Sequence, residues 1–337
     1  MGNRKLSKQQ AWRVEKIQAE RARRAARRDA EAEQALSEGE LGPEQEGLVV
    51  AHYGTQVAIE IAPGQSRRCH LRANLEGLVT GDRVVWCDGE PMGVVVAQLD
   101  RDSVLSRPDS QGKLKPVAAN IDQIIVVVAP FPEPHANLLD RYLVAAEAVG
   151  IEPIILLNKC DLLEGDTQRS TQMVELLAPY PDLDYRVLRT STREHGTRNL
   201  DALLKGHTSV FVGQSGVGKS SLVNLLAPHA DMRTGALSAT TQKGTHTTTT
   251  AELIRLDCGG ALIDSPGIRE FALWHLSREQ IELGFREFRP LLGTCRFRDC
   301  RHEQEPDCAI LAALARGDIL QRRLDSYRHI VASFEDA

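Results

Sequence analysis

The sequence predicts an α/β domain built on a mainly parallel sheet, with a small β-barrel before it and a helical region after it. Three observations lead to this prediction. Short β-rich runs separated by Gly, Pro and Asp fill residues 47–110. Apolar strand-like runs then alternate with amphipathic helical segments over residues 111–276. Residues 277–337 have a helical pattern that a group of Cys and His residues interrupts, and Ser277 with Gln280 predicts a capping box at its first helix.

Residues 1–46 form a charged extension. Residues 1–28 hold ten Lys or Arg against two Glu, whereas residues 29–46 hold seven acids and no base. The extension shows little apolar periodicity, so we expect it to be mobile when unbound. Its basic part suits a polyanionic partner such as nucleic acid. A solvated charged helix without a partner is the alternative.

The composition argues against a membrane protein. No apolar run is long enough to span a bilayer, and the N-terminus has no apolar signal-peptide core. We expect a cytoplasmic monomer with no membrane partner. The seven cysteines, an odd number, argue against a disulfide framework.

Residues 47–110 are expected to fold as an OB-type barrel. Its four or five short strands come from the runs "GLVVAHYGTQVAIEIA", "RRCHLRA", "DRVVWCDG" and "MGVVVAQLD". Such barrels often bind oligonucleotides, and a barrel that only packs against its neighbour is the alternative.

The α/β region begins with the strand candidates "QIIVVVAP", "PIILLNK", "YRVLRTS" and "TSVFVG", each followed by a helical segment. A hairpin-like pair, "AELIRL" and "GALIDSPG", completes the set. Apolar strands that alternate with amphipathic helices predict a mainly parallel sheet covered on both faces.

A complete phosphate-loop motif follows "TSVFVG" and opens a helical segment. Its residues are Gly213, Gln214, Ser215, Gly216, Val217, Gly218, Lys219 and Ser220, with Ser221 next in the helix. The glycines let main-chain N–H groups turn toward phosphates at the helix N-terminus. Lys219 is expected to reach the β- and γ-phosphates, and Ser220 is expected to bind Mg²⁺.

A second motif, "DSPG", ends the last strand candidate. Asp264 is expected to be a further Mg²⁺ anchor, and the Gly267 N–H can sense the γ-phosphate. By itself this tetrapeptide would be an ordinary turn. Its place after a phosphate loop favours the magnesium role.

A third motif, Asn158-Lys159-Cys160-Asp161, ends "PIILLNK". The Asp161 carboxylate can accept two hydrogen bonds from the N1–H and exocyclic amine of guanine, a pair that adenine lacks. Thr190 and Ser191 follow the next strand, where a loop would support the base. Together with the phosphate loop, this motif indicates GTP rather than ATP.

The loop "KGTHTTTT" lies between the phosphate loop and Asp264. A Thr-rich loop at this position suits a switch that orders when Thr247 or Thr248 reaches Mg²⁺. Ile268 follows Gly267, where many GTPases have a water-orienting Gln. His246 is therefore the candidate catalytic group by position, with a main-chain contact or a group supplied by a bound partner as alternatives. We expect slow intrinsic hydrolysis that a partner accelerates.

Four potential metal ligands lie within fourteen residues near the C-terminus. They are Cys295, Cys300, His302 and Cys308. Three thiolates and one imidazole suit a tetrahedral Zn²⁺, and four protein ligands leave no open position, so one structural zinc is expected.

The order of the motifs is a circular permutation, because an ordinary GTPase has the phosphate loop before Asn-Lys-x-Asp. A sheet tolerates such a permutation since chain ends often lie close together. With the barrel and the Cys/His spacing, the chain from about Gly47 onward resembles the ribosome small-subunit-dependent GTPases of the RsgA (YjeQ) family. The start "NRKLSKQQAWRV" is also similar to that family.

This resemblance implies a GTP hydrolase with an OB-fold, a permuted GTPase domain and a zinc-binding domain. It implies binding to the small ribosomal subunit and its 16S rRNA late in subunit maturation, with release after GTP becomes GDP. The family's switch contains Arg-His-Thr-Thr-Thr, whereas here Thr245 precedes His246. This chain therefore lacks a positive charge at that position.

Two other classes of function remain open from the residues alone. A nucleotide-gated RNA-binding module with little catalysis would fit the missing Gln, and stimulated turnover would exclude it. A metabolic P-loop kinase would need an acceptor pocket and would tolerate ATP, which Asp161 disfavours.

Overall fold

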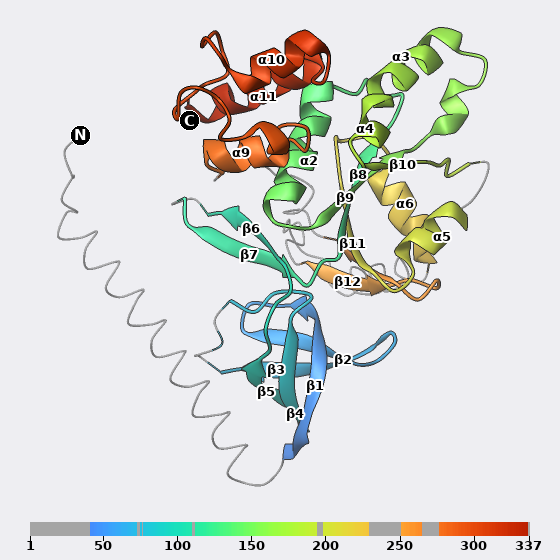
Figure 1. Ribbon diagram of the computed structural model, residues 1–337. Coiled ribbons are helices and arrows are strands. Elements are labelled where there is room, and N and C mark those ends of the chain that lie inside the picture. Colours follow the sequence, from blue (N-terminus) through green and yellow to red (C-terminus); the bar gives the residue numbers. More distant parts are fainter. Residues whose placement is uncertain are drawn as a thin grey trace, which may run out of the picture. The chain divides into compact units, whose positions relative to one another are not determined.

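The computed structural model describes residues 41–72, 75, 77–109, 112–193, 198–228, 251–264 and 276–335 (Figure 1). The chain divides into two compact units between Arg101 and Asp102. Among the residues described, no helix is long and apolar enough to cross a membrane.

The first unit contains a closed five-stranded barrel. Its strands are β1 (Leu41–His52), β2 (Gln56–Ala62), β3 (Gln65–Leu71), β4 (Arg83–Gly89) and β5 (Gly93–Gln98). They pair in the cyclic order β1-β2-β3-β5-β4-β1, with β3 and β5 parallel and the other pairs antiparallel. This is the OB-type barrel predicted from the sequence.

Strand β1 starts at Leu41, six residues before the start expected from the sequence. Its first residues pair with β4, from Leu41 opposite Gly89 to Leu48 opposite Arg83. The side chains of residues 42–46 are exposed, so this part of the strand has the polar composition of a surface segment and gives no apolar alternation.

Alternate side chains of the strands fill the barrel. The buried cluster consists of Val49, Val57, Ile59, Cys69, Leu71, Leu78, Val84, Trp86 and Val95. A Cβ on Gly47 would lie 2.4 Å from Ile59 Cγ2 and 2.6 Å from Trp86 Nε1, so only glycine fits where β1 crosses this cluster.

The second unit begins with a hairpin and continues with a six-stranded sheet. The hairpin strands are β6 (Val104–Pro108) and β7 (Leu114–Ala119). These two strands pair with each other, so the domain boundary that we expected between residues 110 and 111 would separate two paired strands. The sheet strands are β8 (Gln123–Val128), β9 (Glu152–Leu157), β10 (Arg186–Arg189), β11 (Thr208–Val212), β12 (Glu252–Arg255) and β13 (Ala261–Asp264).

The order of strands in this sheet is β10-β9-β8-β11-β13-β12. All neighbours are parallel except β12 and β13, which form the predicted antiparallel pair. The strands β9 and β11 both lie next to β8. The loops that follow them are therefore close together in space, whichever of the two strands comes first in the chain.

Helices cover both faces of the sheet, as the sequence predicted. Helices α5 (Arg198–Leu204) and α6 (Lys219–Leu226) pack on the face that presents Ile125, Val127 and Phe211. Helix α2 (Ala136–Ala148) contacts β8 and β9, and the alternation of side chains places it on the opposite face. The connection from β9 to β10 contains η2 (Cys160–Leu163), α3 (Thr167–Leu177) and α4 (Pro179–Asp182).

The C-terminal region is helical and packs on α2. Its elements are α9 (Arg278–Gly284), η3 (Arg289–Leu291), α10 (Ala309–Arg316) and α11 (Gln321–Glu335). Ser277 and Gln280 form the predicted capping box at the start of α9. A Cβ on Gly284 would lie 2.6 Å from Val144 Cγ1, which shows how closely α9 approaches α2.

A buried polar network joins α2 to α11. Arg323 donates to the Asp140 carboxylate and, at 2.6 Å, to Glu287 Oε1, and Arg323 and Asp140 are both fully buried. The Tyr180 hydroxyl donates to the same Asp140 oxygen at 2.7 Å. Arg323 is therefore the shared cation of two carboxylates inside the unit, where an unpaired buried ion would be costly.

Candidate functional site

The carboxyl ends of three parallel strands place the predicted nucleotide motifs at one edge of the sheet. Strand β9 leads into Asn158, β11 into Gly213, and β13 ends at Asp264. Open parallel sheets bind ligands at this edge. The sheet thus gathers motifs that lie as many as a hundred residues apart in the chain.

Two glycines let the phosphate loop fold closely against its neighbours. Gly213 has φ +135°, and a Cβ there would lie 2.3 Å from the carbonyl oxygen of Val127 in β8. Gly218 has φ +100°, and a Cβ there would lie 2.4 Å from Asn158 Nδ2. Both the backbone conformation and the available space therefore require glycine.

The Asn-Lys-x-Asp motif holds the phosphate loop through two side chains. Asn158 Nδ2 donates to the Val217 carbonyl at 2.9 Å. Lys159 Nζ donates to the Gly216 carbonyl at 2.6 Å and to the Phe131 carbonyl at 3.0 Å. Lys159 has φ +58°, a left-handed conformation that costs free energy in a non-glycine residue and is often found at functional sites.

Asp161 is held by the loop after β10. The Ser191 hydroxyl donates to Asp161 Oδ1 at 2.7 Å, and the Cys160 N–H donates to the Thr190 carbonyl at 3.1 Å. Thr190 and Ser191 are both buried. The structure thus brings Thr190 and Ser191 next to Cys160 and Asp161, as the sequence predicted for the base site.

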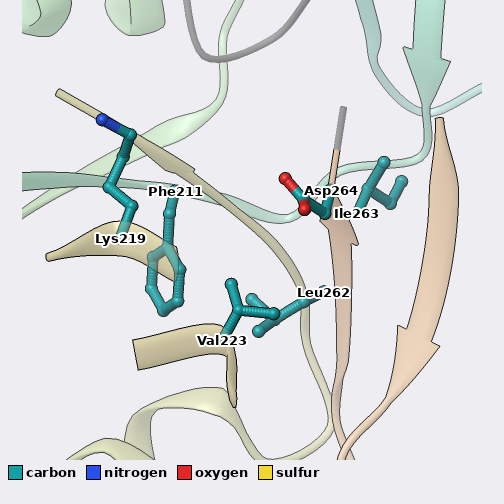
Figure 2. A pocket seen from close by; sticks show the side chains of 6 residues that line it. All are labelled: Phe211, Lys219, Val223, Leu262, Ile263 and Asp264. Carbon is teal, nitrogen blue, oxygen red and sulfur yellow. The ribbon is translucent and has the colours of Figure 1, made fainter. Parts of the chain in front are cut away.

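Lys219 and Asp264 line one small pocket together with Phe211, Val223, Leu262 and Ile263 (Figure 2). Lys219 Nζ donates to the carbonyls of Gly213 and Gln214 at 2.7 and 2.8 Å. Ser220 and Ser221 are exposed in the first turn of α6. The Lys219 ammonium group therefore lies against the phosphate loop, and Asp264 borders the same pocket as Lys219.

The remaining predicted nucleotide residues lie outside the described part of the chain. They are His246, Thr247, Thr248 and Gly267. Their assignments remain predictions.

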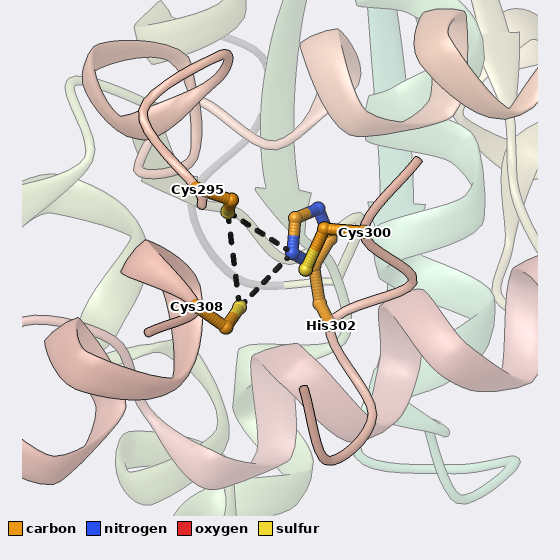
Figure 3. A group of neighbouring side chains, drawn as sticks. All are labelled: Cys295, Cys300, His302 and Cys308. Carbon is orange, nitrogen blue, oxygen red and sulfur yellow. Dashed lines mark hydrogen bonds between the residues drawn. The ribbon is translucent and has the colours of Figure 1, made fainter. Parts of the chain in front are cut away.

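The four predicted metal ligands converge in the C-terminal region (Figure 3). One ligand atom from each of Cys295, Cys300, His302 and Cys308 lies within 4.8 Å of the others. Cys308 Sγ is 3.9 Å from Cys295 Sγ and 3.2 Å from His302 Nδ1, and Cys295 Sγ is 3.7 Å from His302 Nδ1. The cluster can hold a metal ion.

A bound cation would be needed to keep these thiols ionised. Burial raises the pKa of Cys300 to about 12 and also raises the pKa of Cys308. Three thiolates at such short distances repel one another, and a divalent cation would compensate that charge.

A second layer around this cluster was missed by the sequence analysis. Glu282 Oε1 lies 3.5 Å from His302 Nε2 and accepts hydrogen bonds from Tyr327 at 2.8 Å and Arg278 at 3.1 Å. Burial opposes ionisation of Glu282, but the hydrogen bonds from these three residues lower its pKa. The capping box could have placed Arg278 and Glu282 one turn apart on α9. No local signal links either residue to Tyr327.

The sheet, the phosphate loop and the order of the motifs define a circularly permuted P-loop GTPase. The family model described as RsgA GTPase matches residues 98–274. Proteins named "Small ribosomal subunit biogenesis GTPase RsgA" from Ectopseudomonas mendocina and Azotobacter vinelandii are each 59% identical over 342 aligned positions, which cover 100% of this chain and 99% of theirs.

Two solved structures are similar to the whole fold. The crystal structure of YjeQ from Thermotoga maritima has a TM-score of 0.71 and 31% identity, with 88% of this chain and 100% of that chain covered. YloQ, described as a circularly permuted GTPase, has a TM-score of 0.69 and 27% identity, with 87% and 96% covered. The chain belongs to the RsgA GTPase family and is a GTP hydrolase, which confirms the resemblance seen in its motifs.

Proposed function

We propose that this protein hydrolyses GTP on the small ribosomal subunit during the subunit's biogenesis, and that the subunit stimulates hydrolysis. Relatives named as small ribosomal subunit biogenesis GTPases align with essentially the whole chain at 58–59% identity. The observation that supports the proposal most directly is that Asn158 and Lys159 donate hydrogen bonds to carbonyls of the phosphate loop. These bonds make the base-binding motif and the phosphate-binding motif parts of one site.

The base side of this site favours guanine. Ser191 holds Asp161 by Oδ1, which fixes the plane of the carboxylate at the edge of the sheet. In that orientation the carboxylate accepts from two adjacent guanine donors, and an adenine would leave it without partners. Asn158 Oδ1 is buried and has no hydrogen-bond partner within the described residues, so a further acceptor is available beside the base.

The phosphate side uses Lys219, Ser220 and Asp264. Lys219 exchanges its two loop carbonyls for β- and γ-phosphate oxygens, which are stronger, charged acceptors. Ser220 and Asp264 would hold Mg²⁺, with Thr247 or Thr248 as the switch ligand. When bound, Mg²⁺ neutralises charge that develops on the phosphates. Thr247, Thr248, His246 and Gly267 would complete the site after the switch becomes ordered.

Zinc is the metal that best fits the Cys/His cluster. A tetrahedral Zn²⁺ with Zn–S near 2.3 Å and Zn–N near 2.0 Å gives edges of about 3.8 Å between sulfurs and about 3.5 Å between sulfur and nitrogen. The distances among Cys295, His302 and Cys308, 3.9 Å and 3.2–3.7 Å, lie near these edges, and all four ligand atoms lie within 4.8 Å of one another. We assign this zinc a structural role. We also propose that the barrel and the C-terminal helical region bind 16S rRNA.

The test is GTP hydrolysis by the full-length protein with and without small ribosomal subunits, with large subunits and ATP as controls. Strong stimulation by small subunits alone, confined to GTP, is the expected result. Tight GTP binding without stimulation would overturn the proposal and favour a nucleotide-gated RNA-binding module.

A further inference from the structure

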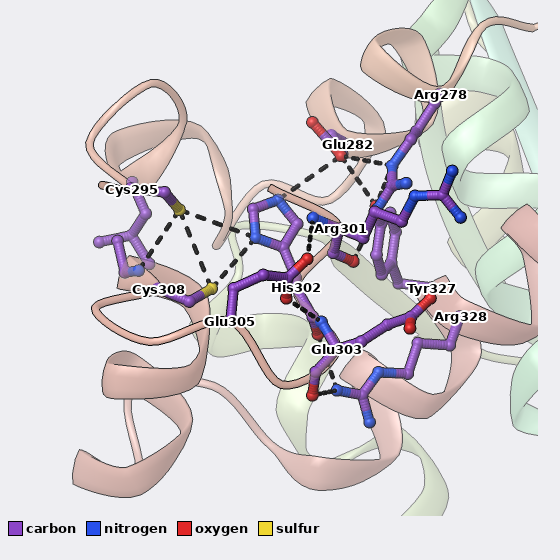
Figure 4. A network of polar contacts seen from close by, with 12 residues as sticks. Arg278, Glu282, Cys295, Arg301, His302, Glu303, Glu305, Cys308, Tyr327 and Arg328 are labelled. Atoms are coloured by element: carbon purple, nitrogen blue, oxygen red, sulfur yellow. Dashed lines mark hydrogen bonds and ion pairs between the residues drawn. The ribbon is translucent and has the colours of Figure 1, made fainter. Parts of the chain in front are cut away.

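The loop from Cys300 to Glu305 carries the imidazole ligand of the Cys/His cluster, and a carboxylate from α9 faces the far side of that ring (Figure 4). We propose that Glu282 positions His302, so that Nδ1 faces the three sulfurs and the metal binds more tightly. Glu282 is a positioning residue, since it faces the imidazole and the metal would contact His302.

The two ring nitrogens of His302 have different surroundings. Nδ1 is 3.2 Å from Cys308 Sγ and 3.7 Å from Cys295 Sγ, whereas Nε2 is 3.5 Å from Glu282 Oε1. The side chains of His302 and Glu282 are only 6% and 14% exposed, so water competes little for this contact. The ring is therefore oriented between a metal side and a carboxylate side.

A carboxylate on the far side selects one tautomer. A neutral imidazole has one N–H and one lone pair, and an ionised carboxylate can only accept a hydrogen bond. Glu282 therefore favours the proton on Nε2 and leaves the Nδ1 lone pair for the metal. Such a contact also makes the imidazole a stronger ligand, and loss of an outer carboxylate typically weakens metal binding by about 10–100-fold.

Glu282 is itself fixed by two other side chains. Tyr327 and Arg278 both donate to Oε1, and Arg278 Nε also donates to the Tyr327 hydroxyl at 3.0 Å. These groups come from α9 and α11. The helices that pack on α2 therefore also set the orientation of the metal ligand.

The backbone of the loop has further supports. Arg278, which also contacts Glu282, donates through Nη2 to the Arg301 carbonyl at 2.6 Å, and Arg328, which does not contact Glu282, donates through Nη2 to the His302 carbonyl at 2.7 Å. The Glu305 carboxylate accepts from the N–H groups of residues 301, 303 and 304. Removal of the Glu282 carboxylate thus releases the ring of His302 while the main chain stays held.

The experiment measures metal affinity of the full-length protein by competition with a chromophoric zinc chelator. The variants are Glu282→Gln and Glu282→Leu, and Glu279→Gln is the control because Glu279 is exposed on the same helix. We expect the Kd for Zn²⁺ to rise about tenfold for Gln and up to about a hundredfold for Leu, with no change for the control.

A second readout separates orientation from folding. With Co²⁺ in place of Zn²⁺, the visible absorption reports the ligand set, and we expect the Glu282→Leu spectrum to shift toward that of His302→Ala. If Glu282→Leu does not fold, Tyr327→Phe replaces it, because it removes one hydrogen bond to Glu282 without removing the carboxylate; a few-fold rise in Kd is then expected.

This inference rests on the proposed zinc site, and the outcomes distinguish the two. A wild-type protein that binds neither Zn²⁺ nor Co²⁺ would overturn both. Tight wild-type binding, with unchanged affinity and spectra in the Glu282 and Tyr327 variants, would leave the zinc site intact and overturn the positioning role alone.

Discussion

Asn158 Nδ2 donates a hydrogen bond to the Val217 carbonyl across a sequence separation of 59 residues. This bond joins the end of β9 to the phosphate loop after β11, on the two sides of β8. It explains how a chain with the base motif first can build the same site as one with the phosphate loop first. The sheet sets which motifs meet, and the order in the chain sets only how the loops are connected.

Replacement of Asn158 by alanine should weaken nucleotide binding more than it weakens the fold. The side chain is 1% exposed, and its loss leaves the Val217 carbonyl without this donor. An unpaired buried polar group costs about 1–3 kcal/mol. The free loop can shift to avoid this cost, and nucleotide binding must then restore the loop, which corresponds to roughly a 5- to 150-fold loss of affinity. Titration with a fluorescent GDP analogue measures the loss, and wild-type affinity would contradict this role.

Gly218→Ala should impair the site far more than Gly206→Ala. Both residues have positive φ, but a Cβ on Gly206 meets nothing within 4 Å, whereas one on Gly218 lies 2.4 Å from Asn158 Nδ2. The control, Gly206→Ala, has only the free-energy cost of a non-glycine residue at positive φ, which is about 1–2 kcal/mol. We expect reduced GDP affinity for Gly218→Ala alone. Equal effects of the two changes would show that the contact with Asn158 is unimportant.

Asp161→Asn should change the preferred base. The amide presents one acceptor and one donor in place of two acceptors, so it meets the guanine amine with a repulsive pairing. We expect GTP affinity to fall at least about a hundredfold. Xanthosine triphosphate, which has an oxygen at that position, should bind better than GTP. Competition binding with the two nucleotides checks this, with Glu164→Gln as the control because Glu164 is exposed nearby.

Arg323→Met should destabilise the second unit strongly, in contrast to Arg316→Met. Arg323 is 1% exposed and its loss leaves the buried carboxylates of Asp140 and Glu287 without their cation. Removal of one partner from a buried pair costs about 3–5 kcal/mol. The exposed pair of Arg316 and Asp318 should contribute less than about 1 kcal/mol. Urea unfolding of both variants measures the difference, and similar midpoints would refute it.

The sequence was most informative where a signal is local. The phosphate loop, the capping box at Ser277 and the Cys/His spacing each lie within a short segment, and rules of backbone conformation and ligand geometry act at that range. The OB-type barrel and the parallel sheet were also predicted and are confirmed, because apolar periodicity records which faces are buried. The start of β1 at Leu41 was missed because its side chains are exposed.

The tertiary structure decided everything that depends on residues far apart in the chain. Arg323 and Asp140 are 183 residues apart, and Tyr327 and Glu282 are 45 apart. No local pattern specifies such pairs, because they arise from how α9 and α11 pack on α2. The sequence by itself determined the motifs, their permuted order and the four candidate metal ligands. Only packing decided which carbonyl Asn158 holds and which nitrogen of His302 faces the sulfurs.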